Sequence, residues 1–218
     1  MKKMTETMKA LRRLFQEADT PSVAQALVGM YLEHTLEDGG KLGGWIVDCE
    51  AYLGPEDEAA HSYGLRKTPR VAAMYQEAGS IYLYQMHRHT ILNIVTREAG
   101  LPQGVMIRAL EPAPEYLAAM QENRQGQTGV ALTNGPGKLM AALQVPFSLY
   151  GESIFTSPLH LVPEKRRQPK QVLAVPRIGI PNKGKWTDLP LRYVCRGNPY
   201  VTKQLKKDVS PDWGWQTH

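Results

Sequence analysis

The stretch WIVDCEAYL, residues 45–53, decides the fold of this chain, because it concentrates the β-branched, aromatic and apolar side chains that favour extended structure. Successive side chains of a strand point to opposite faces, so Asp48, Glu50 and Tyr52 share one face. The other face carries Trp45, Val47, Cys49 and Ala51. The sequence therefore predicts a strand that packs one face on the core and turns a carboxylate and a tyrosine toward a cleft.

Two helices and a first strand are expected ahead of this segment. Apolar residues recur at helical spacing over residues 4–19, and this helix is expected to end before a Thr-Pro pair. A second helix at 22–30 is expected to lead into a strand at 29–35. The run EDGGKLGG, residues 37–44, has turn chemistry, because glycine supplies the positive φ angles that tight turns need.

The segments after this strand mix short helices with further strands. The run EDEAAH, residues 56–61, follows a Gly-Pro pair and predicts a helix start, because proline and acidic residues favour a first turn. Further β-rich stretches lie at 80–96, 104–112, 171–181 and 189–197, and helices are expected at about 113–123 and 138–145. Because the strands do not alternate with helices in a βαβ rhythm, the chain is predicted to be a single α+β domain with a mostly antiparallel sheet.

The composition narrows the class of protein. The chain has 218 residues, enough for a sizeable core, and no apolar run approaches the roughly 18 residues of a membrane span. The formal charge is +5, and lysines and arginines gather over 163–207, which resembles a DNA-binding face but also fits an ordinary solvated surface. The charged N-terminus is unlike a secretory signal, and Cys49 and Cys195 fit the reduced thiols of a cytosolic protein.

The residues around Glu50 give this side chain a specific interpretation. Taken alone, Glu50 fits an ordinary exposed strand residue. The string VDCEAYLGPEDEAAHSYG, residues 47–64, however, resembles the signature of the alkyladenine (3-methyladenine or methylpurine) DNA glycosylase family. The resemblance continues in order along the chain, through GSIYLY (79–84), Asn93, IRALEP (107–112), NGPGKL (134–139), RIGI (177–180) and LRYVCRGNPYV (191–201). Together these motifs cover roughly residues 22–203.

The resemblance implies a base-excision-repair enzyme that flips damaged purines out of duplex DNA and hydrolyses the base–sugar bond, leaving an abasic site. Flipping is needed because the target atom is unreachable inside a duplex. The lesions implied are 3-methyladenine, 7-methylguanine, hypoxanthine and ethenoadenine, and the fold implied has a protruding β-hairpin for DNA. No lysine lies in a recognisable Schiff-base motif, so a monofunctional glycosylase is predicted.

The resemblance assigns catalytic roles to two residues. Glu50 matches the family's general base, which activates the water that attacks the anomeric carbon. Arg108 matches the arginine that helps to hold this water beside the glutamate. Hydrolysis of an N-glycosidic bond passes through an oxocarbenium-like sugar, so a nearby carboxylate can both accept the proton and stabilise the developing positive charge.

The resemblance also assigns a base-binding pocket. Tyr52 and His61 match the aromatic pair that sandwiches the flipped base, Tyr84 matches the tyrosine that closes the wall, and Asn93 matches the asparagine that helps to reject guanine. Alkylated purines are often cationic, and an aromatic slot attracts them through stacking and cation–π interaction. In isolation His61 also fits a helix-face residue with a satisfied hydrogen bond, and Tyr82 fits core packing.

The sequence departs from the family at the expected DNA hairpin. The segment YLYQMHRHTILN, residues 82–93, is one residue shorter between Tyr84 and Asn93 and lacks the tyrosine that fills the hole left by the flipped nucleotide. Met86 or His87 is the expected substitute. Met86 ranks first, because flexible apolar side chains insert between base steps in minor-groove proteins.

Contacts with the DNA backbone are expected at Lys138 and Arg196. Lys138 follows a helix entry, and a helix N-terminus can hold a phosphate, while Arg196 lies inside a matching motif. Either residue also fits a solvated surface charge. The pair His87 and His89 offers two imidazoles without a third ligand, so neither a metal nor a cofactor is predicted.

The expected partner is double-stranded DNA containing damaged purines. The protein is expected to be a cytoplasmic monomer without membrane contact, in a bacterial-type cytosol or nucleoid, because flipping one base needs no symmetry. The glycosylase domain is expected over 1–203, with an N-terminal helix within 1–20. A tail at 204–218 would either pack back on the domain or be disordered.

Two other functions stay open from the sequence. The first is an enzyme that acts on free nucleosides or small glycosides with the same glutamate and aromatic slot. The second is a non-catalytic DNA-binding relative. The basic surface disfavours the first, and the presence of both Glu50 and Arg108 disfavours the second, because a binding protein has no need of a pair that activates water.

Overall fold

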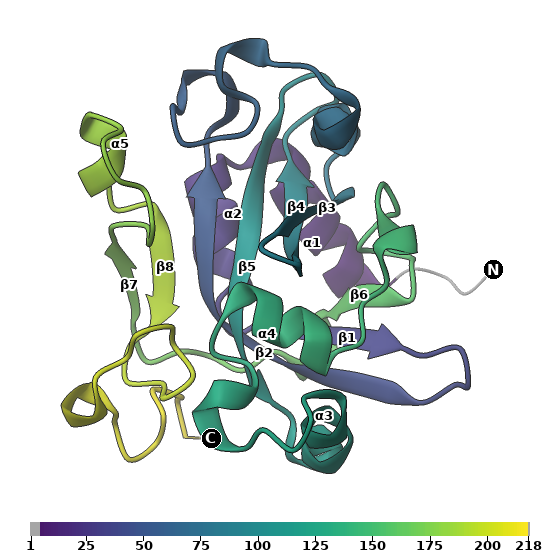
Figure 1. The fold of residues 1–218 in the computed structure, drawn as a ribbon, viewed down its shortest axis with the longest axis vertical. Helices are drawn as coiled ribbons and strands as arrows, with labels where there is room; N and C mark the ends of the chain where they lie inside the picture. The colour runs from purple at the N-terminus through teal and green to yellow at the C-terminus, as the bar shows by residue number, and fades with distance from the viewer. Residues whose placement is uncertain (1–4, 218) are drawn as a thin grey trace.

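The computed structural model describes residues 5–217, and its centre is an eight-stranded sheet in which the strand pairings are antiparallel (Figure 1). The order is β3-β4-β5-β2-β1-β6, and β8 pairs with both β2 and β7. The strands are β1 (Tyr31–Thr35), β2 (Lys41–Tyr52), β3 (Ile81–Met86), β4 (His89–Thr96), β5 (Gln103–Pro112), β6 (Leu159–Val162), β7 (Val172–Val175) and β8 (Arg192–Cys195). The predicted class, a single α+β domain with a mostly antiparallel sheet, is confirmed.

The helices cover both faces of this sheet. They are α1 (Glu6–Glu17), α2 (Thr20–Leu27), α3 (Leu117–Asn123), α4 (Pro136–Ala142) and α5 (Lys185–Asp188), with short 3₁₀ turns between them. In the view of Figure 1, α1 and α2 lie behind the sheet and α4 lies in front of it. The first two expected helices and the strand at 29–35 are therefore confirmed, although Met4, where the first helix was expected to begin, lies outside the described residues.

Both early helices begin at a polar side chain that binds a free amide. The Thr5 hydroxyl accepts from the Met8 N–H at 3.2 Å, and the Asp19 carboxylate accepts from the Ser22 N–H at 2.7 Å. These bonds satisfy donors that the first turn of a helix leaves unpaired. The apolar face of α2 is buried against β2, and that of α1 joins the same core, with Phe15, Leu27 and Ile46 among the fully buried side chains. Each such side chain stabilises the fold by about 1.5–3 kcal/mol.

Strand β2 positions the candidate site because it changes partner along its length. Its first residues pair with β1, whereas Asp48 to Glu50 pair with β8 on the same side. On its other side β2 pairs with β5, and the register shifts immediately before and after Asp48. Such irregularities bend a strand and redirect its side chains. The curled edge made by β7 and β8 is visible at the left of Figure 1.

The C-terminal residues pack back on the sheet, which is one of the two alternatives that the sequence left open. Trp215 is buried, and its indole N–H donates to Glu111 Oε2 at 2.7 Å. Glu111 also accepts from Arg167 at 2.6 Å and from Asn198 at 2.5 Å. A single buried carboxylate therefore ties the end of the chain to β5.

Residues 56–61 do not form the expected helix, so this prediction is wrong. The chain makes one 3₁₀ turn at Gly54–Glu56 and continues in turns. Asp57 supplies the physical reason, because its carboxylate accepts from the backbone N–H groups of Leu53 at 3.1 Å and Ala59 at 3.0 Å. Aspartate side chains that bind nearby amides in this way compete with helix formation.

Candidate active site

Glu50 is fully buried in β2, which overturns the interpretation as an ordinary exposed strand residue. Its Oε2 accepts a hydrogen bond from the Tyr52 hydroxyl at 2.9 Å. Its Oε1 accepts from the Ile178 N–H at 2.9 Å and lies 3.1 Å from Arg108 Nη1. Both carboxylate oxygens are therefore held in a fixed orientation by donors from three separate segments of the chain.

The alternation predicted for this strand is confirmed by side-chain contacts. The hydroxyl of Tyr52 reaches Glu50 along one face. The thiol of Cys49, which immediately precedes Glu50 in sequence, donates instead to the carbonyl of Ala24 at 3.1 Å, inside α2 on the other side. Burial raises the pKa of this thiol, so Cys49 is a packing residue and not a nucleophile.

Arg108 reaches Glu50 because β5 is irregular at this point. Ile107 pairs with Cys49 and Ala109 pairs with Asp48, so Arg108 has no partner in β2. An extra residue of this kind redirects a side chain relative to the regular pleat. Within the part of the chain that the structure describes, the buried Nε of Arg108 has no hydrogen-bond acceptor.

The electrostatics of Glu50 suit a proton acceptor. Burial raises the pKa of Glu50, while the charge of Arg108 and the Ile178 N–H oppose the rise. A carboxylate with a raised pKa is a stronger base than an ordinary surface glutamate, and the guanidinium beside it favours its ionised form. The arrangement can therefore take a proton from a water and stabilise nearby positive charge.

A cavity of about 320 Å³ opens beside this carboxylate. This volume falls in the range of small-molecule sites, roughly 300–1,000 Å³. The residues that both bind Glu50 and line the cavity are Tyr52, Arg108 and Ile178. The cavity brings together six residues predicted from the sequence, Tyr52, His61, Tyr84, Met86, Asn93 and Arg108.

Part of the cavity wall is an aromatic cluster centred on His61. The His61 ring lies 4.5 Å from the Tyr84 ring, edge to face, and its Nδ1 lies 2.8 Å from the Tyr82 hydroxyl. Burial lowers the pKa of His61, with the charges of Arg70 and Arg66 acting in the same direction, so the imidazole is neutral at neutral pH. Tyr82 is buried, as core packing predicted, but it also lines the cavity and fixes the histidine.

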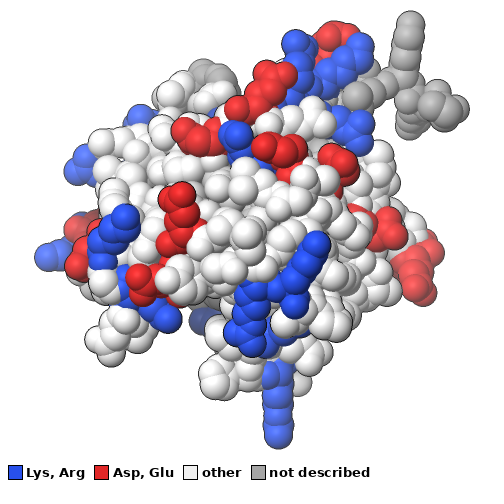
Figure 2. All heavy atoms as spheres, turned by 90° about the horizontal axis from the view of Figure 1, so that it is seen from above, with Lys and Arg blue, Asp and Glu red and all other residues white. Residues whose placement is uncertain are grey.

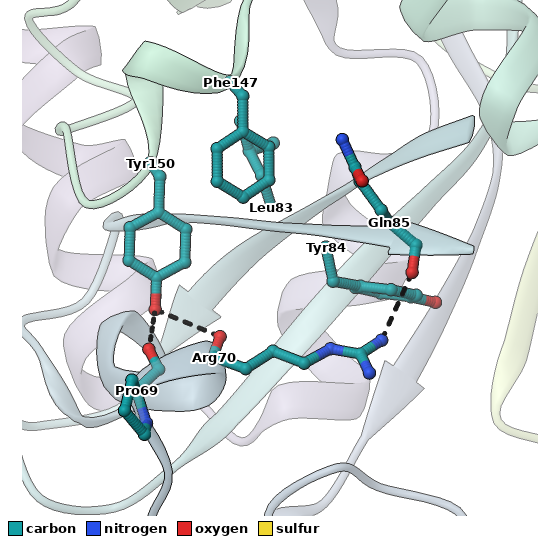
Figure 3. A pocket seen from close by; sticks show the side chains of 7 residues that line it. All are labelled: Pro69, Arg70, Leu83, Tyr84, Gln85, Phe147 and Tyr150. Atoms are coloured by element: carbon teal, nitrogen blue, oxygen red, sulfur yellow. Dashed lines mark hydrogen bonds between the residues drawn. The ribbon is translucent and has the colours of Figure 1, made fainter. Parts of the chain in front are cut away.

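Tyr84 separates this cavity from a second, more open groove. The groove has a volume of about 530 Å³ and lies between Arg70, Gln85 and the rings of Phe147 and Tyr150 (Figure 3). The Arg70 guanidinium lies 5.5 Å from the centre of the Tyr84 ring and donates to the Gln85 carbonyl at 3.3 Å. The Tyr84 ring is thus held by His61 from one direction and by Arg70 from another.

The β3–β4 hairpin ends at the mouth of the cavity. Met86 pairs with His89, so His87 and Arg88 form a two-residue turn, and both have positive φ, 48° and 68°. Met86 is 47% exposed and still lines the cavity, whereas His87 is exposed and does not line it. Helix α4 packs on this tip at Gly137, where a Cβ would lie 2.6 Å from the Cβ of His89, so glycine permits the close approach.

Lys138 and Arg196 do not line the cavity. Lys138 donates to Asn134 Oδ1 at 2.8 Å, and Arg196 donates to Gln171 Oε1 at 2.7 Å beyond the end of β8. The cavity is nevertheless flanked by other cations, because Arg66, Arg70 and Lys183 line a hollow of about 400 Å³ that also contains His61. On the face drawn in Figure 2, a group of Lys and Arg side chains stands apart from most of the Asp and Glu side chains.

Sequence reasoning missed two residues beneath the cavity, Asp57 and Arg177, and a backbone donor at Ile178. The side chains of Asp57 and Arg177 are fully buried and form an ion pair. Arg177 and Ile178 belong to the RIGI motif and Asp57 to the motif after β2, so the signal was present. It gave these residues no role, because a motif does not show which backbone amide meets which side chain.

Within residues 5–217 no group of three or more histidine, cysteine, aspartate or glutamate side chains is arranged to hold a metal ion. Over the same residues no helix is long and apolar enough to span a membrane.

Comparison with known proteins points to one family. The model of the family described as methylpurine-DNA glycosylase (MPG) matches residues 14–199. A protein of Enterococcus faecalis is 62% identical over 214 residues, which cover 98% of this chain and 93% of the relative. Proteins of Staphylococcus carnosus and Staphylococcus epidermidis are 45% and 43% identical, over 94% and 93% of this chain and 98% of each relative. All three relatives carry the provisional name 3-methyladenine DNA glycosylase.

Proposed function

The chain belongs to the methylpurine-DNA glycosylase family, and from this premise we propose that it excises damaged purines from double-stranded DNA by hydrolysing the N-glycosidic bond. The observation that carries the proposal is the buried carboxylate of Glu50, held by Arg108 and the Ile178 N–H beside an aromatic cavity. Burial of this charge costs free energy, as the raised pKa of Glu50 indicates, and a non-catalytic DNA-binding relative would gain nothing from that cost.

In the proposed reaction the oxygen of a water attacks the anomeric carbon of the flipped nucleotide. The proton of the water passes to Glu50, the carbon–nitrogen bond breaks, and its electron pair leaves with the base. Arg108, which lines the cavity, is proposed to hold the water through an N–H group that Glu50 does not use. The ionised carboxylate also stabilises the positive charge that develops on the sugar. The product is an abasic site, and the absence of a covalent lysine step makes the enzyme monofunctional.

The aromatic cavity accounts for recognition of the lesion. We place the flipped purine between Tyr52 and His61, with Tyr84 closing the wall and Asn93 against the edge of the base, all of which line the cavity. Because His61 is neutral, it does not repel a cationic base such as 3-methyladenine or 7-methylguanine. The same platform also accepts neutral hypoxanthine or ethenoadenine by stacking.

Access to the cavity requires the base to leave the duplex. The basic side chains around His61, together with Lys138 and Arg196, are proposed to contact phosphates, and the hairpin tip is proposed to enter the minor groove. One chain acting on one base needs no partner subunit, so a monomer acting on DNA in a bacterial cytosol is proposed.

Met86 is proposed as the wedge, because it is exposed at the hairpin tip and also borders the cavity. We expect Met86→Ala to weaken flipping by about 10-fold, since the lost apolar contact is worth about 1–2 kcal/mol. The fluorescence of an ethenoadenine in duplex DNA, which changes as the base unstacks, measures this directly. His87→Ala is the matched control, and a larger loss in that variant would assign the wedge to His87 instead.

The rate of base release is expected to fall as the pH drops through the raised pKa of Glu50, because a protonated carboxyl cannot accept a proton from water. Arg108 lowers this pKa, so Arg108→Met should move the acid limb of the profile to higher pH. Single-turnover rates at constant ionic strength give both profiles. An acid limb at the same pH in both proteins would show that another group, such as His61, controls it.

The function itself is tested with duplex DNA that holds one hypoxanthine or ethenoadenine, followed by hot alkali, with an undamaged duplex alongside. Cleavage at the lesion after alkali, and none before it, would establish a monofunctional glycosylase. Binding that is lost steeply with added salt, without cleavage, would point to a non-catalytic DNA-binding relative, since counterion release scales with phosphate contacts. Cleavage of the free nucleoside at a comparable rate would point to a nucleoside hydrolase.

A further inference from the structure

Arg177 is a buried cation that touches no part of the cavity surface yet joins three segments that build it. Its Nη1 and Nη2 donate to the two carboxylate oxygens of Asp57 at 2.6 and 2.9 Å. Nη1 also donates to the carbonyl of Ala51 at 3.1 Å, and Nη2 donates to the carbonyl of Trp186 at 3.3 Å. The guanidinium thereby connects the end of β2, the turn after it and the segment ahead of β8.

Two functional groups of the candidate site depend on this cation. The guanidinium carbon lies 4.6 Å from the centre of the Tyr52 ring, so it packs on the tyrosine. The residue that follows Arg177 is Ile178, whose N–H donates to Glu50 Oε1. One side chain therefore contacts the stacking ring and anchors the backbone next to one of the donors that hold the carboxylate.

The partner of Arg177 extends this support to the base-binding loop. Asp57 accepts from the N–H groups of Leu53 and Ala59 in addition to the guanidinium, and Ala59 lies two residues before His61. Movement of Arg177 would consequently disturb both aromatic platforms between which we place the purine. A planar fork with several fixed donors is needed here, and a lysine ammonium cannot reproduce it.

We propose that Arg177, held by Asp57, is a positioning residue for base excision: it fixes the Tyr52 ring and the Ile178 N–H that orients Glu50. The inference rests on the proposed function, since it assigns a role within that same site. Positioning of this kind affects the chemical step strongly, because small displacements of reacting groups reduce the rate by large factors.

The test compares Arg177→Lys with Arg192→Lys. Both replacements keep the positive charge and lose a buried two-bond contact to an aspartate, Asp57 in one case and Asp48 in the other. Arg192 is the matched control, because its side-chain hydrogen bonds within residues 5–217 go to Asp48 and Thr202 and not to Tyr52 or Ile178. Arg192 lies opposite Glu50 in the strand pairing and acts on it through its charge, which the lysine keeps.

We expect Arg177→Lys to lower the single-turnover rate on a hypoxanthine duplex by about 10- to 100-fold. We also expect it to move the acid limb to higher pH by about one pH unit, because the Ile178 N–H lowers the pKa of Glu50 and would no longer be held in place. Arg192→Lys should keep the acid limb of the parent, although both variants lose stability toward urea.

The outcomes separate this inference from the function on which it rests. If the parent protein released no base from any lesion duplex, the proposed function itself would be refuted. An active parent, with Arg177→Lys retaining the parental rate and acid limb, would overturn the positioning role alone. Equal shifts of the acid limb in both lysine variants would also overturn it, since they would show a general loss of packing.

A second variant keeps the test decisive if Arg177→Lys does not unfold cooperatively. Asp57→Asn is nearly isosteric and leaves the guanidinium beside Tyr52, but its amide nitrogen cannot accept the second bond of the fork. We expect the same direction of change with a smaller magnitude, and an unchanged rate and acid limb would overturn the proposal.

Discussion

Glu50→Gln is expected to lower the single-turnover rate of base release by about 1,000-fold or more while lesion-containing DNA still binds. Glutamine has nearly the shape of glutamate, so the contacts with Tyr52 and Ile178 can persist. An amide cannot take a proton from water, however, and it carries no negative charge to stabilise the sugar cation. The loss should therefore lie in the chemical step and not in recognition.

Alkaline cleavage of a hypoxanthine duplex measures the rate, and fluorescence anisotropy of the same duplex measures binding. Tyr52→Phe is the matched control, because it keeps the stacking ring and removes one hydrogen bond to Glu50. We expect a much smaller loss in that variant. If Glu50→Gln excised the base at a rate near that of the parent, Glu50 would not be the base, and the proposed mechanism would fail.

The same substitution is expected to leave the free energy of unfolding equal to or above that of the parent at neutral pH. Burial raises the pKa of Glu50, so the folded protein holds the ionised form at a cost. The stability of the parent should accordingly rise as the pH falls through this pKa, and that rise should be missing from Glu50→Gln. Urea unfolding at several pH values measures it. A catalytic group that costs stability is the pattern expected of an active site.

Local patterns in the sequence explain which parts of this structure could be predicted. The strand expected at 45–53 could be predicted because its own residues alternate between two faces. The observed strand begins earlier, at Lys41, because the glycines before Trp45 also pair with β1. Glu50 and Arg108 gained their roles from a resemblance that runs along most of the chain. The structure places both at the cavity, together with the aromatic candidates Tyr52, His61 and Tyr84.

The parts that could not be predicted depend on contacts between distant segments. Asp57 and Arg177 are 120 residues apart in sequence, and no periodicity relates them. The turn at His87 and Arg88 has positive φ at both residues. Two-residue hairpin turns usually have asparagine or glycine at such positions, so this turn had no signal in the sequence. The failure of the helix at 56–61 has the same origin, since the Asp57 carboxylate is committed to loop amides and to Arg177.

Asp48→Ala is expected to lower the free energy of unfolding by about 3–5 kcal/mol, because it leaves Arg192 buried without its counter-charge. Asp48 is fully buried and accepts from Arg192 Nε at 2.9 Å, from Arg192 Nη2 at 2.7 Å and from the Thr202 N–H at 3.0 Å. Small domains have only about 5–15 kcal/mol of stability in total. Thermal unfolding should therefore begin about 6–20 °C earlier, as circular dichroism would measure.

The double variant Asp48→Leu with Arg192→Met controls for the source of this loss. Removing both charges leaves no unpaired ion, so most of the lost stability should return. If the double variant were as unstable as Asp48→Ala, packing between β2 and β8, and not the unpaired guanidinium, would be the cause.

Asp48 and Glu50 lie two residues apart on the same strand, and their substitutions are expected to have opposite consequences. Glu50→Gln should fold at least as well as the parent and lose the reaction. Asp48→Ala should lose stability and keep the reaction wherever it is folded, with the acid limb at lower pH, because the charge of Asp48 raises the pKa of Glu50. Rates measured below the unfolding transition test this directly. A folded Asp48→Ala protein without activity would mean that the Asp48–Arg192 pair belongs to the catalytic machinery and not only to the strand pairing that supports it.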